Sequence, residues 1–250
     1  MTHFLQRYLA GEQERVWAEL LTLGKQLRVE PLYTEAQAVV RETMRRAKHN
    51  IETLVSSLSS IDYVFGYGFL RPDEADFAQS APPVYRPPDP NVQEQIEELE
   101  SLTGTLPLAL RGWYETIGAV NFVGDYPRWD PLVRLLDPLY VEPIEVVLDV
   151  CRTQRKWGTT GEAAQGNDGR HQFIFIAPDA HLKYNVSGMG AYEIAVPNEA
   201  IDGLLLHEPH NTTFINYLRI CFRWAGFPGL ENYPPPPEEL TRLTQGLLSL

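Results

Sequence analysis

The turn His207-Glu208-Pro209-His210 holds the densest group of side chains that could do chemistry. His181 and Asp179 precede it, and His171 opens a predicted strand. A zinc site needs three or four converging ligands, and the metalloprotease helix carries the pattern His-Glu-x-x-His. Here the two histidines of the turn are three residues apart with a proline between them. Because this spacing does not fit a metal site, we predict no metal and no other cofactor.

The sequence also lacks the motifs that are typical of nucleophilic and acid–base catalysis. Ser187-Gly188 and Cys151 stand outside any Gly-x-Ser-x-Gly turn. The carboxylate pair Glu97-Glu98 lies on a short predicted helix, where acidic residues near the N-terminus favour the helix dipole. We therefore predict that the protein is not an enzyme. The alternative is a hydrolase-type enzyme whose site is assembled in space from His207, His210 and an acidic residue, since such a site leaves no motif.

The chain is acidic, and its charge is unevenly distributed. It has 33 Asp and Glu against 21 Lys and Arg, a formal net charge of −12. Residues 1–60 carry eight basic and seven acidic side chains, so the acidity belongs to the rest of the chain. Such a field repels phosphate backbones, which argues against nucleic acid as a direct ligand and favours a basic protein partner. The alternative interpretation is that the acidity only keeps the protein soluble.

The cysteines and the N-terminus bear on the compartment. Cys151 and Cys221 lie seventy residues apart without a Cys-x-x-Cys spacing, which indicates buried thiols in a reducing compartment. The first residues lead into the charged stretch 12–15 and lack the apolar core of a signal peptide. No stretch approaches about 20 uninterrupted apolar residues. We expect a cytoplasmic protein without a membrane segment.

Helical periodicity dominates the first sixty residues. Apolar side chains repeat at three and four residues over 15–27 and again over 36–58, which predicts two helices separated by Pro31. Thr34 and Gln37 have the spacing of a capping box at the start of the second helix. We expect the opposite face of this helix to be solvated and dispensable for folding; its basic residues are Arg41, Arg45, Arg46 and Lys48.

The remaining elements predict three regions and an α+β fold. We expect a helical N-terminal region over 1–70, a Pro-rich linker over 71–91 and an α+β domain over 92–250. The segment 143–153 suits both helix and strand, and we favour the helix. Helices followed by strands and then helices are typical of α+β folds with a mainly antiparallel sheet. The other predicted helices span 91–102, 107–117, 213–224 and 240–248, and the predicted strands span 120–123, 171–177, 182–186, 191–196 and 203–206.

One stretch carries a family resemblance. Ile96-Glu97-Glu98-Leu99-Glu100, followed by Gly104 to Gly118 with the pair Leu106-Pro107 and then Arg111, Trp113 and Tyr114, resembles the opening of the SUKH superfamily (Smi/Knr-like proteins). The resemblance covers about residues 90–230 and includes a closing helix like 214–224. The chain departs from the family in reading Gly118-Ala119-Val120-Asn121 after the second helix and in a long insertion between Val123 and His171.

The resemblance implies a binding module without enzymatic activity. Many bacterial members are immunity proteins that neutralise a toxin domain, often a nuclease, and others are adaptors in signalling. The acidic C-terminal region would suit a basic toxin domain. We therefore expect a protein partner held by the sheet face. A third hypothesis, self-association through the N-terminal helices, stays open because the sequence does not determine the oligomeric state.

A short loop after the first predicted strand is the expected protein-binding site. It combines two carboxylates, Asp125 and Asp130, with two aromatic side chains, Tyr126 and Trp129. Aromatic residues are favoured anchors at the centre of interfaces, and acidic neighbours steer a basic partner. The alternative is that Tyr126 and Trp129 fold back and cover the edge of the sheet.

Overall fold

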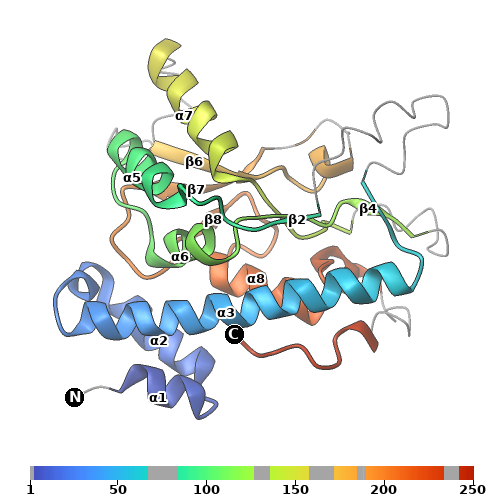
Figure 1. Ribbon diagram of the computed structural model, residues 1–250, viewed down its shortest axis with the longest axis horizontal. Coiled ribbons are helices and arrows are strands. Elements are labelled where there is room, and N and C mark those ends of the chain that lie inside the picture. Colours follow the sequence, from blue (N-terminus) through green and yellow to red (C-terminus); the bar gives the residue numbers. More distant parts are fainter. Residues whose placement is uncertain are drawn as a thin grey trace.

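The computed structural model describes residues 3–66, 84–126, 136–157, 172–184, 188, 190–233 and 242–250. They form an α+β fold, as the sequence predicts. Figure 1 shows helix α3 running along one side of the molecule, with α1 and α2 on its outer side and with α6 and α8 between α3 and the strands. The α-helices are α1 (Phe4–Leu9), α2 (Gln13–Leu23), α3 (Leu32–Ser60), α5 (Val92–Thr103), α6 (Leu108–Thr116), α7 (Ile144–Trp157) and α8 (Phe214–Arg223).

The strands pair in small antiparallel sheets whose orders are β1-β4, β2-β3-β5 and β6-β7-β8. The amide of Glu142, just after β5, donates to the carbonyl of Ile176 in β6 at 2.9 Å, so the second and third sheets meet at this edge. The strands are β1 (Val64–Phe65), β2 (Tyr85–Arg86), β3 (Ala119–Asn121), β4 (Gly124–Asp125), β5 (Tyr140–Val141), β6 (Gln172–Ala177), β7 (Tyr192–Val196) and β8 (Leu205–Leu206).

The long helix predicted over 36–58 is confirmed as α3, whereas the helix predicted over 15–27 ends at Leu23 and is followed by the 3-10 helix η1 (Gly24–Arg28). The start of α3 also differs from the prediction. The helix begins at Leu32, directly after Pro31, and no side chain caps it. The predicted capping box is wrong because the Thr34 hydroxyl donates to the carboxylate of Glu30 at 2.8 Å instead. The ambiguous segment 143–153 is helical, as favoured, and forms most of α7.

Two other predicted elements are wrong. The segment 182–186 was expected to be a strand, but Leu182–Tyr184 forms the 3-10 helix η3, because the Asp179 carboxylate accepts the amides of His181 and Leu182. The segment 240–248 was expected to be a helix. Among its described residues only Arg242 and Leu243 are helical, and the chain continues through a turn into an extended end.

The C-terminal segment 242–250 packs against α3 through a buried amide. Asn50, fully buried on α3, donates to the carbonyl of Leu248 at 2.9 Å and accepts the amide of Leu248 at 2.7 Å. The side chain thus pairs with the main chain as a neighbouring strand would. A helix would use these main-chain groups internally, which explains why the apolar periodicity of this segment does not produce one.

The end of the predicted linker takes part in the sheet. Tyr85 and Arg86 form β2, which pairs with β3 through Tyr85–Val120 and Arg86–Ala119. The part of the linker over 71–83 lies outside the described residues. The described end is therefore an edge strand of the sheet.

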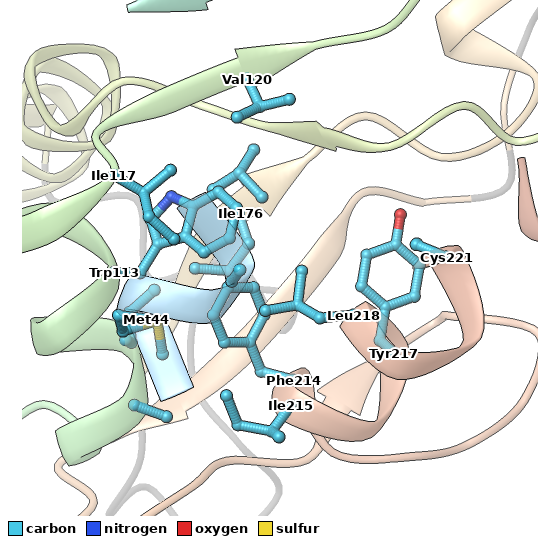
Figure 2. Close-up of a cluster of buried hydrophobic side chains, with 14 of the residues drawn as sticks. Met44, Trp113, Ile117, Val120, Ile176, Phe214, Ile215, Tyr217, Leu218 and Cys221 are labelled. Carbon is cyan, nitrogen blue, oxygen red and sulfur yellow. The ribbon is translucent and has the colours of Figure 1, made fainter. Parts of the chain in front are cut away.

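The core continues without interruption from the N-terminal helices to the sheet. Figure 2 shows Trp113 of α6 between Ile176 of the sheet and Phe214 of α8, with Met44 of α3 on the near side. The rings of Trp113 and Phe214 meet edge to face with centroids 5.4 Å apart, and the Trp113 indole donates to the carbonyl of Gly118 at 2.7 Å. Such contacts make Trp113 a packing centre for three layers.

The basic face of α3 is not uniformly solvated, which corrects the prediction. The side chain of Arg46 is only 13% exposed, lies over the ring of Tyr8, and donates to the carbonyl of Ser249 at 2.9 Å. Arg41 is exposed, and Arg45 pairs with Glu42 at the surface. One of the four basic residues therefore joins α3 to α1 and to the C-terminal segment.

Replacing Trp113 with Ala should lower the free energy of unfolding by about 3 to 5 kcal/mol, because the cavity would open at the junction of three layers. Urea denaturation followed by circular dichroism measures the loss. Trp113→Phe, which keeps a ring at the site, should lose less. A Trp113→Ala protein as stable as the wild type would contradict the packing described here.

Arg46→Gln should lower the free energy of unfolding by about 1 to 3 kcal/mol, because a charged donor to a main-chain carbonyl is lost. Arg41→Gln is the matched control on the same helix and should change it by less than about 0.5 kcal/mol. Thermal melts of the two variants side by side make the comparison. Equal effects would mean that the contact with Ser249 contributes nothing.

Candidate functional site

The face of the β6-β7-β8 sheet that points away from α6 and α8 is the candidate site. Side chains alternate along each strand, and the inward set is buried. The inward residues are Ile174, Ile176, Tyr192, Ile194 and Val196. The outward residues form what we call the outer sheet face, which consists of Phe173, Phe175, Glu193, Ala195, Leu204 and Leu206.

Register places these six side chains in two rows. Phe175 pairs with Glu193, and Glu193 pairs with Leu206. In the next row Phe173 pairs with Ala195, which the register sets opposite Leu204. Directly opposed side chains on one face of an antiparallel sheet lie about 5 Å apart. The outer sheet face is therefore a compact apolar patch with one carboxylate inside it.

The apolar members of this face do not serve the core. Phe173 and Phe175 are partly exposed and do not pack against the hydrophobic core of the described residues. Leu204 is 51% exposed. An apolar cluster that is left partly open to water on a sheet marks a binding surface more often than an isolated exposed side chain does.

The electrostatics of the face centre on Glu193. Burial raises the pKa of the Glu193 carboxyl, and the nearby His207 lowers it in part. The His207 Nε2 atom lies 3.7 Å from the Glu193 carboxylate, and the histidine side chain is more than half exposed. A partly desolvated carboxylate beside an exposed histidine can pair with a stronger cation from a partner.

A buried ion pair lies behind the face. Lys183 of η3 is 1% exposed, and its ammonium group binds the carboxylate of Asp137. The hydroxyl of Tyr192 donates to the other oxygen of Asp137 at 3.0 Å, and the Lys183 ammonium lies 4.8 Å from the centre of the Tyr192 ring. Tyr192 is the inward neighbour of Glu193 on β7, so this pair anchors the strand that carries the carboxylate.

A second carboxylate cluster fixes the turn after β8. The ring of His210 lies between the buried Glu208 and Glu231 of the 3-10 helix η4 (Pro228–Asn232), with the Nε2 atom 2.7 Å from Glu231. Burial lowers the pKa of His210, but the hydrogen bonds with Glu208 and then Glu231 outweigh it, so the pKa is raised overall. The pairing ties the end of the sheet to the helical layer beneath it.

The structure places the two histidines of the turn 207–210 in different ion pairs. His207 pairs with Glu193, whereas His210 pairs with Glu208 and Glu231, so the two rings serve different carboxylates. Asp179 caps the turn into η3. Among the described residues no three His, Cys, Asp or Glu side chains form a group suited to a metal ion. His171 and Asp168 lie outside the described residues.

The predicted binding loop is only partly described. Asp125 lies in β4, paired with Val64, and is half-buried. Tyr126 is 1% exposed and belongs to the core, as the alternative interpretation expected for this side chain. Trp129 and Asp130 lie outside the described residues.

The two cysteines are free and buried, as predicted. Burial raises the pKa of the Cys151 thiol to about 11 and raises that of Cys221 well above its usual range. A thiol with a raised pKa is protonated at neutral pH and is a poor nucleophile.

Sequence reasoning missed Phe173, Phe175 and Glu193 as a group. The signal was present in β6, where residues 173–177 are apolar on both faces although an exposed antiparallel face is usually polar. The pairing of Lys183 with Asp137 left no such signal, because 46 residues separate them.

Comparison with known proteins identifies no relative, since no family model, no curated protein and no solved structure matches the chain. Within the described ranges, no helix combines the length and the apolar character that a membrane crossing requires.

Breaking the buried ion pair on one side should be strongly destabilising. Lys183→Met or Asp137→Leu alone should each cost about 3 to 5 kcal/mol, because an uncompensated charge stays buried. The double variant, which removes both charges, should be more stable than the sum of the single losses predicts. Guanidinium denaturation of the four proteins gives the coupling energy. Strictly additive losses would show that the two groups do not interact.

Proposed function

We propose that the chain is a non-enzymatic protein-binding module of the SUKH-like type, an immunity or adaptor protein that docks a basic partner protein on its outer sheet face. The observation that carries the proposal is the partly exposed pair Phe173 and Phe175 beside Glu193. Aromatic side chains supply large contact areas at little cost in conformational entropy, which is why they recur as interface anchors.

Rigidity of the surface supports the proposal. The outer residues stand on paired strands, and the Lys183–Asp137 pair and the His210 cluster hold those strands from behind. A surface that is already ordered before binding loses little entropy on association. A sheet face of this kind suits a partner whose shape is also fixed.

Charge indicates the chemistry of the partner. Glu193 lies between Phe175 and Leu206, so a guanidinium group could pair with the carboxylate and stack on the ring at the same time. The net charge of −12 adds long-range attraction for a basic protein. Nucleic acid is disfavoured as a direct ligand for the same reason.

The order of elements supports the SUKH-like assignment. Helix α5, the Leu106-Pro107 pair and α6 precede strands β3 to β8, and α8 follows them. The free, buried cysteines support a cytoplasmic location. The hydrolase alternative has less support, because His207 and His210 pair with different carboxylates.

Site-specific photo-crosslinking tests the proposal. A photoreactive phenylalanine analogue replaces Phe175 in the full chain, expressed in the native host, and the crosslinked partner is identified by mass spectrometry. The same analogue at Val29, which is 64% exposed in the turn before α3, is the control. A basic protein captured from Phe175 and absent from Val29 supports the proposal. Equal capture from both positions, or capture from neither, contradicts it.

Charge reversal at the centre of the face should abolish binding of the partner so identified. Glu193→Lys should weaken the affinity at least about 30-fold, the effect of losing a hot-spot contact of roughly 2 kcal/mol. Titration calorimetry at several salt concentrations should show that the wild-type affinity falls as salt rises and that Glu193→Gln reduces this dependence. Val29→Asp should bind as the wild type does. An unchanged affinity in Glu193→Lys, with the fold intact, would remove this face as the binding site.

A further inference from the structure

The ring of His210 contacts a carboxylate through each of its two nitrogen atoms. The Nδ1 atom bonds an oxygen of Glu208, and the Nε2 atom lies 2.7 Å from an oxygen of Glu231. An ionised carboxylate only accepts hydrogen bonds, and a neutral imidazole has a single N–H group. Both bonds therefore form together only when the cluster holds one extra proton. Histidine is more basic than a carboxylate, so at neutral pH this proton belongs on the ring.

Glu208 and His210 depend on each other for their charges. Glu208 is 1% exposed, and its second oxygen accepts the amide of His210 at 2.9 Å. Burial raises the pKa of the Glu208 carboxyl, and the bonds and the charge of His210 lower it in part. Within the described ranges, His210 is the only basic group that forms an ion pair with either carboxylate. A ring without its extra proton would leave Glu208 buried without a counter-ion, which is costly.

The remaining charges near the cluster do not replace that proton. Asp137 acts on Glu208 with the same sign of charge, and the ammonium group of Lys183 is bound to Asp137. Water reaches the cluster from the side of η4, since the side chain of Glu231 is 37% exposed and that of His210 is 19% exposed. The ring can therefore exchange its proton with solvent. The other titratable groups that face Glu208 are Tyr192 of β7 and Cys221 of α8.

The cluster closes a turn with an uncommon backbone. His207 and Asn211, at the two ends of the turn 207–211, have φ angles of 64° and 50°, which residues other than glycine seldom adopt. Such conformations persist where the surroundings hold them. The contact with Glu231 joins this turn to η4. The turn also carries His207, whose ring lies 3.7 Å from the Glu193 carboxylate on the outer sheet face.

We propose that His210 is a proton-dependent latch, which as imidazolium closes the turn 207–211 onto η4 and which opens the turn when the ring loses its second proton. The proton passes from a ring nitrogen to solvent, and no covalent bond between heavy atoms changes. The bond to Glu231 is the one that is lost, because the Glu208 side stays buried and bound to the amide. Opening moves His207 away from Glu193. The latch acts whether or not a partner binds the outer sheet face.

The direction of the pH dependence follows from the hydrogen bonds of the ring. Burial lowers the pKa of His210, but the bonds with Glu208 and Glu231 outweigh it and raise the pKa above the ordinary value of 6.5. A group whose pKa is raised by folding stabilises the folded state fully below its unfolded pKa. This contribution is lost as the pH rises through the raised value. The latch is therefore closed in mildly acidic solution and opens on the alkaline side.

NMR titration of the histidine rings in the full chain tests the protonation step, with the His210 signals assigned by their loss in His210→Gln. The midpoint for His210 should lie above 6.5. Glu231→Gln, at a partly exposed position, should lower it because one of the two carboxylates is removed. Glu94→Gln, at an exposed position on α5, is the control and should leave it unchanged. A midpoint at or below 6.5, or one that Glu231→Gln does not lower, would overturn the proposal.

Hydrogen exchange tests the opening of the turn. The amide of Asn211 donates to the carbonyl of Glu208 at 3.1 Å, so its protection reports whether the turn is closed. After correction for the intrinsic exchange rate, its protection should fall at least about tenfold between about pH 6 and about pH 8.5, the effect of losing one charge-assisted hydrogen bond. The amides of the central strand β7 are the internal control and should stay protected. In His210→Gln and Glu231→Gln the protection of Asn211 should be low at both pH values. Constant protection in the wild type, an equal fall in both variants, or an equal fall along β7 would overturn the latch.

Discussion

The close approach of α3 to α6 at Gly112 is the constraint on which the arrangement depends. A Cβ atom at Gly112 would lie 2.5 Å from the Val40 Cγ1 atom and 3.4 Å from the Met44 Cγ atom, so a larger residue there would require the Val40 side chain to shift or the helices to move apart. The next residue of α6, Trp113, packs against the sheet and α8. Helix α6 is thus a shared middle layer. Because α6 lies between them, the N-terminal helices and the strands bury a common core. The same arrangement positions the surface of α3 to hold the C-terminal segment.

The polar groups buried behind the sheet are a second constraint, and their energetics differ from those of the core. Lys183 and Asp137 lose their hydration on folding, and their attraction and the further hydrogen bond from Tyr192 oppose this cost. Two apolar residues of the same volume could fill the space as stably. Removing either charge would leave the other buried and unpaired, so the ion pair ties η3 to the segment that carries Asp137 and, through Tyr192, to β7. The position of Glu193 on the outer face follows from the alternation of side chains along β7, since its neighbour Tyr192 is buried.

The sequence predicts an element correctly where apolar residues repeat with the period of that element and form its buried face. Helix α3 shows apolar residues at helical spacing over its whole length, and β7 shows the alternation expected of an antiparallel strand with one buried face, so both were predicted. Periodicity gave a wrong prediction where main-chain groups form hydrogen bonds with residues far away in the sequence. The end of the chain has the leucine spacing of a helix, but Asn50, almost two hundred residues away, takes the main-chain bonds of Leu248. In the same way, η3 replaced a predicted strand because of one carboxylate, that of Asp179.

The candidate site was harder to predict than the fold because it joins residues from separate elements. The outer sheet face requires the β6-β7-β8 register before Phe175, Glu193 and Leu206 become neighbours. Periodicity assigns each side chain to a face of its own strand, but only the pairing of the strands brings the side chains of one face together.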